Sequence, residues 1–371
     1  MAQQKDSGSS NLTLTVFMDA SRKFLVVGGV CLVLLMIFQF GLTIYQNIKA
    51  QRDSYVAELP TMGYSYLPPI NFPRSSVLYP PTNYILSYRG SSDPRDLPQF
   101  GSDNNMRIYK IASSPYSLLA DRRARELAAT YGFTGEPQAL DNQTYRFFTS
   151  DGMLDQQLQI DLQTFAFSLT SNYLTNPDFL KGAGNSKQLP NRTMAAGDVR
   201  GFLSMAGVLP ADLVDAQTEV NYVKAVGDRV ELVDTFYEAD FLSVNLPRAP
   251  LEGNYSFFGP NKRSSIFAIV ARDTLGNDYI VHLDYFYHQI NAADSQTYPL
   301  RSTASAFEVL QSGGAYIASM GNNSQVVIDN VQVGYYEDPN GGDYLQPIFI
   351  FSSSDGFAAY VQAVDQRAVG R

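Results

Sequence analysis

Hydrophobic residues form one long uninterrupted run near the start of the chain. From Phe24 to Tyr45 no side chain is charged, and basic residues flank the run on both sides. A helix needs about 20 apolar residues to cross the hydrocarbon core of a bilayer. A cleaved signal peptide has a shorter apolar region with a small-residue cleavage site behind it, and a helix of a globular core carries a polar stripe. The pattern therefore predicts a transmembrane helix over residues 22–49, in which residues 24–45 contact the lipid bilayer.

The basic residues around this run predict its orientation. Three of them precede the run and two follow it closely, so the positive-inside tendency places the N-terminus in the cytoplasm. Residues 1–21 are rich in Ser, Asn and Gln and are predicted to form a disordered cytoplasmic tail. No later run is long enough to span a bilayer. We therefore expect a single-pass, signal-anchored protein of the cell membrane whose C-terminal part is extracytoplasmic.

Proline, glycine and serine recur through residues 50–106. Proline prevents long helices, and proline-rich segments are extended, at about 3.1 Å per residue. We predict an extended stalk that contributes little to a core, with a short strand at "NYILSYRG".

Helical and strand patterns follow one another through the rest of the chain. Helices are predicted where apolar residues share one face behind a cap, as with Ser114 at the start and Gly132 at the end of the first. Hairpins are predicted where alternating apolar residues flank Gly, Asn and Asp. The expected order is helix 114–133, strands 144–150 and 158–171, helix 193–212, hairpins within 219–248 and 265–290, helix 302–318, and strands 325–338, 344–353 and 356–365.

This order predicts the α+β class, with antiparallel sheets each covered by helices in tandem helix-plus-hairpin units. The expected organisation is a tail at 1–21, a transmembrane helix at 22–49, a stalk at 50–106, a first α+β unit at 107–192, a middle unit at 193–300 and a C-terminal unit at 301–371.

The charge and cysteine content of the chain limit which partners and which cellular location it suits. The net charge is −9 and the basic residues are mostly dispersed, which disfavours nucleic acid and anionic lipid surfaces as partners because both bind through clustered Lys and Arg. The only cysteine, Cys31, lies in the apolar run, so the rest of the chain cannot form an internal disulfide. That usage suits a bacterial envelope protein better than a eukaryotic ectodomain.

The end of the chain carries a resemblance to a known family. It reads "AFEVLQSGG", followed by "VQVGYYEDPNGGDYLQPIFIFSSSDGFAAYVQAVD", and "ARELAATYGFTGEPQALDNQTYRFF" repeats the order in weaker form. This helix-plus-hairpin order resembles PepSY-type units and the extracytoplasmic parts of bacterial regulatory proteins of the YycH/YycI type. The resemblance implies a single-pass protein that modulates a partner such as a sensor kinase. The stalk and the middle hairpins depart from that pattern, so no named partner carries over.

Two histidines and an aspartate are the strongest candidate for chemistry. His282, Asp284 and His288 lie in "YIVHLDYFYHQ", and alternate residues of a strand share a face. Two imidazoles and a carboxylate can hold a divalent metal with open positions. The two histidines, however, would lie about 20 Å apart along an extended strand, too far for one ion. We favour polar residues on a solvated sheet face, and predict no metal and no other cofactor.

One turn is open to two interpretations. Asp338, Asn340 and Asp343 in "DPNGGD" would suit either a loop calcium site or a hairpin turn, and Asn and Gly favour the turn.

Catalytic signatures are missing from the sequence. There is no G-x-S-x-G, no H-E-x-x-H and no phosphate-binding P-loop. The basic cluster of Arg122, Arg123 and Arg125 is interpreted as the solvated face of a helix.

We therefore expect a membrane-anchored, non-catalytic extracytoplasmic protein that binds or regulates an envelope or membrane protein through protein contacts, using sheet edges or Tyr-rich faces. The alternative is a structural component of a bacterial envelope assembly, such as a secretion or pilus apparatus. A metal-dependent enzyme is the third hypothesis. A regulator would copurify with one partner, whereas a scaffold would run as a large symmetric particle.

Overall fold

The computed structural model describes most of the chain from residue 59 onward. The described residues are 36, 38, 39, 41, 59–74, 80–81, 83–101, 103–112, 119–150, 152–186, 189–273, 276–321 and 325–370. The chain divides into two compact units, Met1–Leu59 and Pro60–Arg371. The sheets and pockets all belong to the second unit.

The predicted transmembrane helix has no support in the structure. Met36, Phe38, Gln39 and Gly41 are helical, and the other residues of 22–49 lie outside the described part of the chain, as does the predicted tail. Among the described residues, no helix is both long and apolar enough to cross a bilayer.

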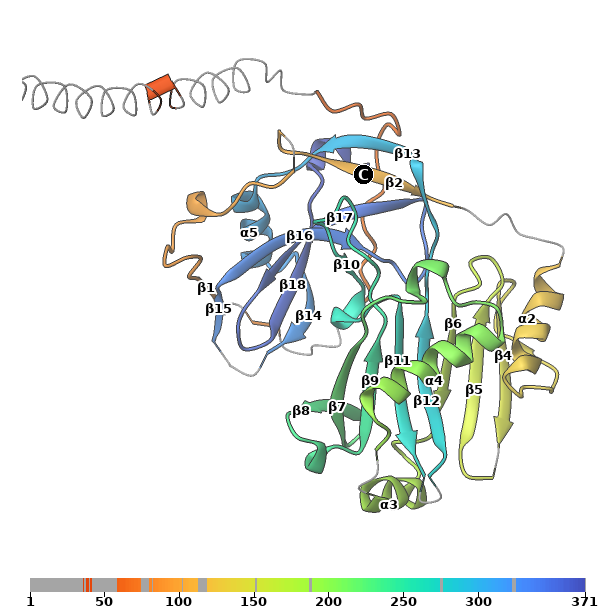
Figure 1. Cartoon of the computed structure of the whole chain (residues 1–371). Helices are drawn as coiled ribbons and strands as arrows, with labels where there is room; N and C mark the ends of the chain where they lie inside the picture. Colours follow the sequence, from red (N-terminus) through yellow and green to blue (C-terminus); the bar gives the residue numbers. More distant parts are fainter. Residues whose placement is uncertain are drawn as a thin grey trace, which may run out of the picture. The chain divides into compact units, whose positions relative to one another are not determined.

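The larger sheet has nine antiparallel strands (Figure 1). In spatial order they are β3 (Gln138–Ala139), β4 (Thr144–Ser150), β5 (Asp155–Asp161), β6 (Phe167–Ser171), β12 (Asp278–Tyr285), β11 (Ile266–Arg272), β9 (Phe241–Asn245), β7 (Glu219–Val226) and β8 (Arg229–Val233). Most neighbours in this order are hairpin partners that follow one another in the sequence. The β6–β12 pair, in which His282 lies opposite Thr170, joins the two series of hairpins.

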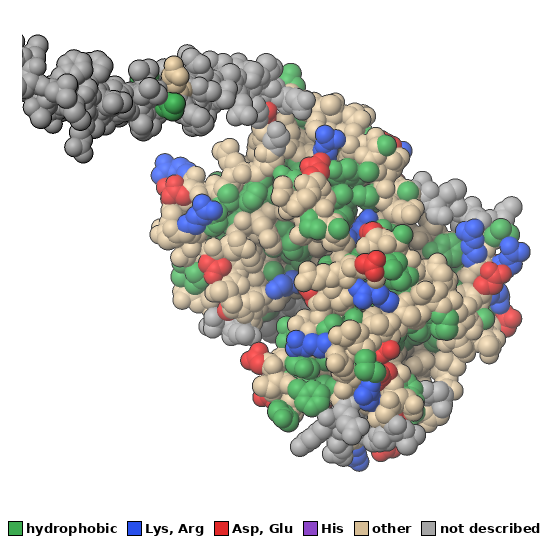
Figure 2. Space-filling view, viewed as in Figure 1, with side chains coloured by type: hydrophobic (Ala, Val, Ile, Leu, Met, Phe, Trp, Pro, Cys, Tyr) green, Lys and Arg blue, Asp and Glu red, His purple; other side chains and the backbone are tan. Residues whose placement is uncertain are grey.

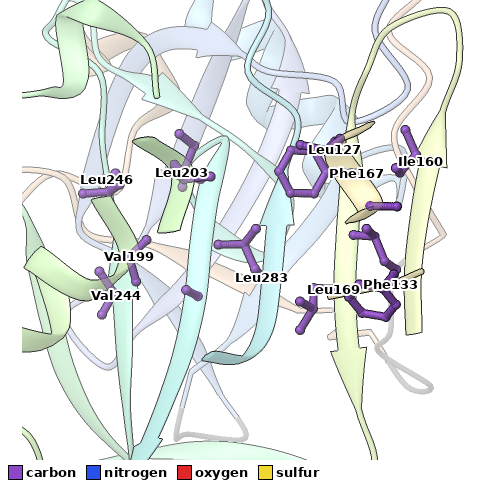
Figure 3. Close-up of a cluster of buried hydrophobic side chains, with 14 of the residues drawn as sticks. Leu127, Phe133, Ile160, Phe167, Leu169, Val199, Leu203, Val244, Leu246 and Leu283 are labelled. Carbon is purple, nitrogen blue, oxygen red and sulfur yellow. The ribbon is translucent and has the colours of Figure 1, made fainter. Parts of the chain in front are cut away.

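Helices α2 (Ala120–Thr130) and α4 (Arg192–Met205) pack on part of one face of this sheet. Asn191 begins α4 by accepting a hydrogen bond from the Thr193 N–H, which satisfies a donor of the first turn. Val199 of α4 then packs with Val244 and Leu283 of the sheet (Figure 3). Helix α3 (Pro177–Ser186) contacts β11 on the opposite face.

The predicted α+β class with helix-covered sheets is wrong, because the chain is mostly β. Strands account for 39% of the residues and helices for 20%. Hairpins that were expected to form separate units join edge to edge, so each buries its apolar face together with the next hairpin. The predicted boundary between a first unit at 107–192 and a middle unit at 193–300 consequently falls inside one sheet.

The second sheet has seven strands. Its path is β10 (Phe257–Phe258), β16 (Asn330–Tyr336), β17 (Tyr344–Ser352), β18 (Phe357–Gln362) and β14 (Tyr316–Met320), with β2 (Asn105–Ile111) beside β17 and β13 (Ile290–Pro299) beside β2. Helix α5 (Thr303–Gln311) contacts β17 and β18 and is capped by Ser302, whose hydroxyl accepts from the Ser305 N–H at 3.1 Å. Strand β17 is buried along seven consecutive residues, so both of its faces are covered.

Residues 60–74, which we name the strap, cover the face of this sheet opposite α5. Phe72 stacks on the ring of Tyr316 with the centroids 5.5 Å apart, and Leu67 is fully buried. The Leu67 N–H donates to the Ala368 carbonyl at 2.9 Å, and the Leu67 carbonyl accepts from the Gly370 N–H at 2.8 Å. The strap contains a turn, in which the Ser65 N–H donates to the Met62 carbonyl, and it contributes Leu67 to the core while Ile70 and Phe72 pack against the core half-buried.

The next described segment also belongs to the core of this sheet. Tyr84 and Leu86 lie in strand β1 (Tyr84–Leu86), which pairs in parallel with β15 (Val326–Ile328), and they are buried together with Leu97. For the described part of residues 50–106, the predicted stalk is therefore wrong: proline excluded helices there without excluding burial.

Candidate binding pocket between the two sheets

A pocket of about 1030 Å³, named the inter-sheet pocket, opens where the two sheets meet. Its walls come mainly from the ends of β2 and β12, the β5–β6 and β16–β17 turns, and the loop 207–213. Rings and aliphatic chains line it together with carboxylates, amides and an imidazole: Phe165, Val208, Leu209, Tyr285, Tyr287 and Ile290 beside Gln143, Asp161, Asp212, His288, Asn340 and Asp343. The pocket thus offers both apolar and polar contacts.

Arg248 is the most enclosed charged side chain of this pocket, with 7% of it exposed. The rings of Phe257 and Tyr287 lie 4.5 and 4.3 Å from its Cζ. The guanidinium donates to the His288 carbonyl at 3.0 Å and pairs with the Glu337 carboxylate at 3.2 Å. Phe257 and Glu337 come from the seven-stranded sheet, whereas Tyr287 and His288 follow β12 of the nine-stranded one. Arg248 therefore ties the two sheets together.

Glu337 is the buried carboxylate that pairs with Arg248, and its burial carries a free-energy cost. Its side chain is 4% exposed, and burial raises its pKa although the charge of Arg248 pulls the pKa down. Glu337 Oε2 and Arg248 Nε have no hydrogen-bond partner among the described residues, and that Nε lies 3.6 Å from the Asp212 carboxylate. A buried ion pair costs desolvation free energy, and losing one member leaves the other unbalanced. The pair therefore holds the two sheets in one arrangement.

His288 lies against the turns that border the pocket. A methyl group at Gly341 would be 3.6 Å from the imidazole ring, and 3.2 Å from Thr164 of the β5–β6 turn. Burial lowers the pKa of His288, and the nearby charge of Arg248 acts in the same direction. The imidazole is therefore neutral at pH 7, and its Nε2 is shielded without a partner in the described part of the chain.

The loop 207–213 is fixed from two sides. Arg200 of α4 donates from Nε to the Leu213 carbonyl at 3.2 Å. The Tyr285 hydroxyl donates to the Val208 carbonyl at 2.9 Å. This wall of the pocket is therefore held in place before any ligand arrives.

Three carboxylates make the pocket acidic. Asp161 accepts hydrogen bonds from backbone N–H groups of its own turn, Asp212 accepts one from a tyrosine hydroxyl at 2.8 Å, and Asp343 is exposed. The charge of Arg248 is balanced by Glu337, and the histidine is neutral. On the face shown in Figure 2, the described Lys and Arg side chains are interspersed with Asp and Glu and form no continuous basic patch.

The structure brings together two of the three residues considered for a metal. His282 Nε2 lies 3.0 Å from Asp284 Oδ2, and Arg263 pairs with the same oxygen at 3.2 Å. Burial would raise the pKa of Asp284, but these two neighbours outweigh it and the pKa is lowered. Strand β12 ends at Tyr285, so the alternation does not extend to His288, which lies at the inter-sheet pocket instead. No group of three His, Cys, Asp or Glu side chains in the described part of the chain could hold a metal ion.

The segment considered for calcium closes the β16–β17 hairpin. The Asp338 carboxylate accepts from the Asn340 N–H at 2.9 Å, and its carbonyl accepts from the Gly341 N–H at 3.0 Å. Gly341 has a φ of +76°, which favours glycine. The turn interpretation accounts for these contacts.

The arginine cluster lies on α2 as a solvated face. Arg125 pairs with Asp121 at 3.1 Å and with Glu136 at 2.7 Å, and Arg122 lies 3.6 Å from Glu126. These side chains are largely exposed, so the contacts add little stability.

Arg248, Glu337 and Asp212 were not identified from the sequence. Glu337 carried a weak signal, because it directly follows a strand of buried residues that ends at Tyr336. Arg248, between two prolines in "LPRAP", carried none.

Comparison with known proteins gives no family. No family model matches the chain, and no curated protein is similar to it. A solved structure, an uncharacterized protein from Eubacterium rectale ATCC 33656, aligns with a TM-score of 0.30 and 11% identity over 71% of this chain and 86% of that one.

Proposed function

We propose that this protein is a non-catalytic binding protein and that its inter-sheet pocket takes up a segment of a protein partner. The carrying observation is the pocket of about 1030 Å³ that both sheets line. Sites for small molecules span roughly 300–1000 Å³, so this one lies at the upper end and has room for several residues of a peptide.

Fixed polar groups support binding over catalysis. Asp161 is held by its own turn, Asp212 by a tyrosine hydroxyl and Arg248 by Glu337. Groups that are already ordered bind a ligand at a smaller entropic cost. A general base must reach the proton it takes within about 3 Å, whereas Nε2 of His288 is shielded.

The lining also indicates which segment fits. Asp161, Asp212 and Asp343 give negative potential, and Phe165 and Leu209 give apolar surface. A segment with Lys or Arg next to an apolar residue complements both, because charge complementarity favours the correct partner and disfavours acidic ones.

The test is an array of twelve-residue peptides of basic, acidic and neutral composition, read by fluorescence polarisation. We expect a subset of basic peptides with an apolar residue to bind. Ala211→Trp places a large ring in the pocket at an exposed position and should weaken binding at least tenfold.

Leu232→Trp, at a 74% exposed position on β8 outside the pocket, is the matched control and should bind as the wild type does. Equal binding of acidic and basic peptides, or unchanged binding by Ala211→Trp, would contradict the proposal.

A structural role in an assembly is the second candidate, and the edge strand β8 favours it. β8 pairs with β7 on one side only, and Leu232 and Tyr237 beside it are 74% and 83% exposed. Unpaired strand edges with apolar side chains promote association. Sedimentation of the full chain should then show a concentration-dependent oligomer that Leu232→Lys abolishes, and a monomer at all concentrations would exclude this role.

A further inference from the structure

A second pocket, of about 810 Å³, lies at the strap and shares no lining residue with the inter-sheet pocket. Tyr66 of the strap, Gln362 at the end of β18, and the short helix η5 (Gln366–Ala368) border it together with Arg301. Two guanidinium groups, Arg301 and Arg367, face this one pocket in a chain whose net charge is −9. We name it the strap pocket.

Arg301 is a partly buried cation that forms no ion pair with any described residue. Its side chain donates one long hydrogen bond, from Nη2 to the Val364 carbonyl at 3.5 Å. Its Nε is shielded from solvent and has no partner among the described residues, and none of the ion pairs between described residues includes it. Burial lowers its pKa, with the Asp365 charge opposing that shift. An arginine nonetheless stays protonated, so the positive charge remains in place without an ion-pair partner.

The neighbours leave that charge available to a ligand. Arg367 is held by Asp365 through contacts of 3.1 and 2.8 Å, so these two charges balance one another. The Gln362 amide is also engaged, accepting from Ile70 at 3.4 Å and donating to Gln346 at 2.8 Å. The residual charge at the strap pocket is therefore the single positive charge of Arg301.

We propose that the strap pocket binds a small anion through Arg301, with a carboxylate or phosphate group as the recognised chemistry. A guanidinium offers a planar fork of donors that matches both groups. The Arg301 side chain lines the pocket. Tyr66, which is 70% exposed at the pocket, presents a ring to the molecule that carries the anionic group.

The test uses inorganic phosphate and acetate as separate probes on the full chain, at constant ionic strength set with chloride. We expect at least one of them to raise the melting temperature saturably above the chloride series, because a ligand of the folded state stabilises it by mass action. The probe that acts identifies the phosphate or the carboxylate source. Arg301→Gln should weaken that binding at least tenfold.

Two variants keep the result interpretable. Arg301→Lys retains the charge without the fork and should bind more weakly than wild type but more tightly than Arg301→Gln. Arg95→Gln removes an 87% exposed arginine that pairs with Asp93 outside the pocket, and should bind normally. The proposal is overturned if neither probe exceeds chloride, or if Arg301→Gln responds as the wild type does.

Discussion

The two sheets of the second unit are assembled in different ways. The nine-stranded sheet grows by hairpins, so β4 pairs with β5, β5 with β6, β7 with β8 and β11 with β12. The seven-stranded sheet contains the local hairpins of β16, β17 and β18 but draws other neighbours from distant parts of the chain: β2 pairs with β13 and β17, and β10 with β16. The first sheet therefore rests largely on local contacts, whereas the second depends on segments that only meet in the finished fold.

The strap is one of these distant segments, and we expect it to stabilise the seven-stranded sheet only. Its apolar residues pack on the seven-stranded sheet, and its hydrogen bonds reach the same unit's last residues. The nine-stranded sheet has its own core with α2 and α4. Changes in the N-terminal segments should therefore destabilise the seven-stranded sheet selectively.

The largest effect is expected from removing residues 1–104. Leu67, Tyr84, Leu86 and Leu97 are buried, and burying such side chains contributes about 1.5–3 kcal/mol each, or about 6–12 kcal/mol together. That approaches the entire stability of a typical domain, about 5–15 kcal/mol. In hydrogen exchange, amides of β16–β18 should lose protection while those of β4–β6 keep it. A chain that begins at Pro60 is the control, and retained protection of β16–β18 in the shorter chain would show that the strap is dispensable.

The next effect concerns the junction of the two sheets. Arg248→Met leaves Glu337 buried without its partner and should lower the free energy of unfolding by about 3–5 kcal/mol in urea titrations. The double variant Arg248→Met, Glu337→Leu should recover most of that loss, since no uncompensated charge remains. The single variant should also separate the melting of the two sheets. A double variant as unstable as the single one would mean that packing, not charge, dominates at this position.

A smaller effect is expected at the strap itself. Phe72 is half-buried and contacts the rings of Tyr316 and Tyr336 with centroid distances of 5.5 and 4.9 Å. Phe72→Ala should cost about 2 kcal/mol in urea unfolding, from lost burial and ring contacts. Phe148→Ala on β4, at a 54% exposed position of the other sheet, should change stability by less than about 0.5 kcal/mol. Equal losses of stability in Phe72→Ala and Phe148→Ala would contradict a selective role of the strap in stabilising the seven-stranded sheet.

The smallest effect is a pH dependence at His288. The pKa of His288 in the folded protein lies below the usual value of about 6.5. As the pH falls below about 6.5, this histidine is therefore protonated in the unfolded chain before it is protonated in the folded protein. Stability should therefore fall as the pH drops from about 6.5 toward the folded pKa, by at most about 1.4 kcal/mol per pH unit. His288→Gln should remove this slope from the difference between the two melting series. Gln289→Asn, at an exposed neighbour, should keep it, and a slope unchanged in His288→Gln would assign the pH dependence to other groups.

Local patterns in the sequence identified most of the hairpins. The strand predicted at residues 144–150 matches β4, and the hairpins predicted within 219–248 and 265–290 contain the pairs β7–β8 and β11–β12. Strands with one buried and one exposed face can be identified from sequence because apolar and polar residues alternate along them. The Ser cap before α5 was also recognisable, because it is a contact between residues three apart.

Non-local features could not be identified in this way. Strand β13 buries only Tyr298 among ten residues, so it has no readable alternation, yet it pairs with β2 over most of its length. The strap resembled a linker in sequence because four of its fifteen residues are prolines. The pocket residue Arg248 and its partner Glu337 are 89 residues apart in the sequence, so their pairing forms only where the two sheets meet.

The bridge between Leu67 and Val369 has a consequence for biosynthesis. The ribosome releases the N-terminal segments first, and a domain's local contacts can form while synthesis continues. The hairpins of the nine-stranded sheet are complete once residue 285 has emerged. Leu67, Tyr84 and Leu97, in contrast, must wait for β16–β18 and for the residues around Val369. During that interval the nascent chain exposes apolar side chains whose partners do not yet exist, so demand for chaperone protection should be highest immediately before translation ends.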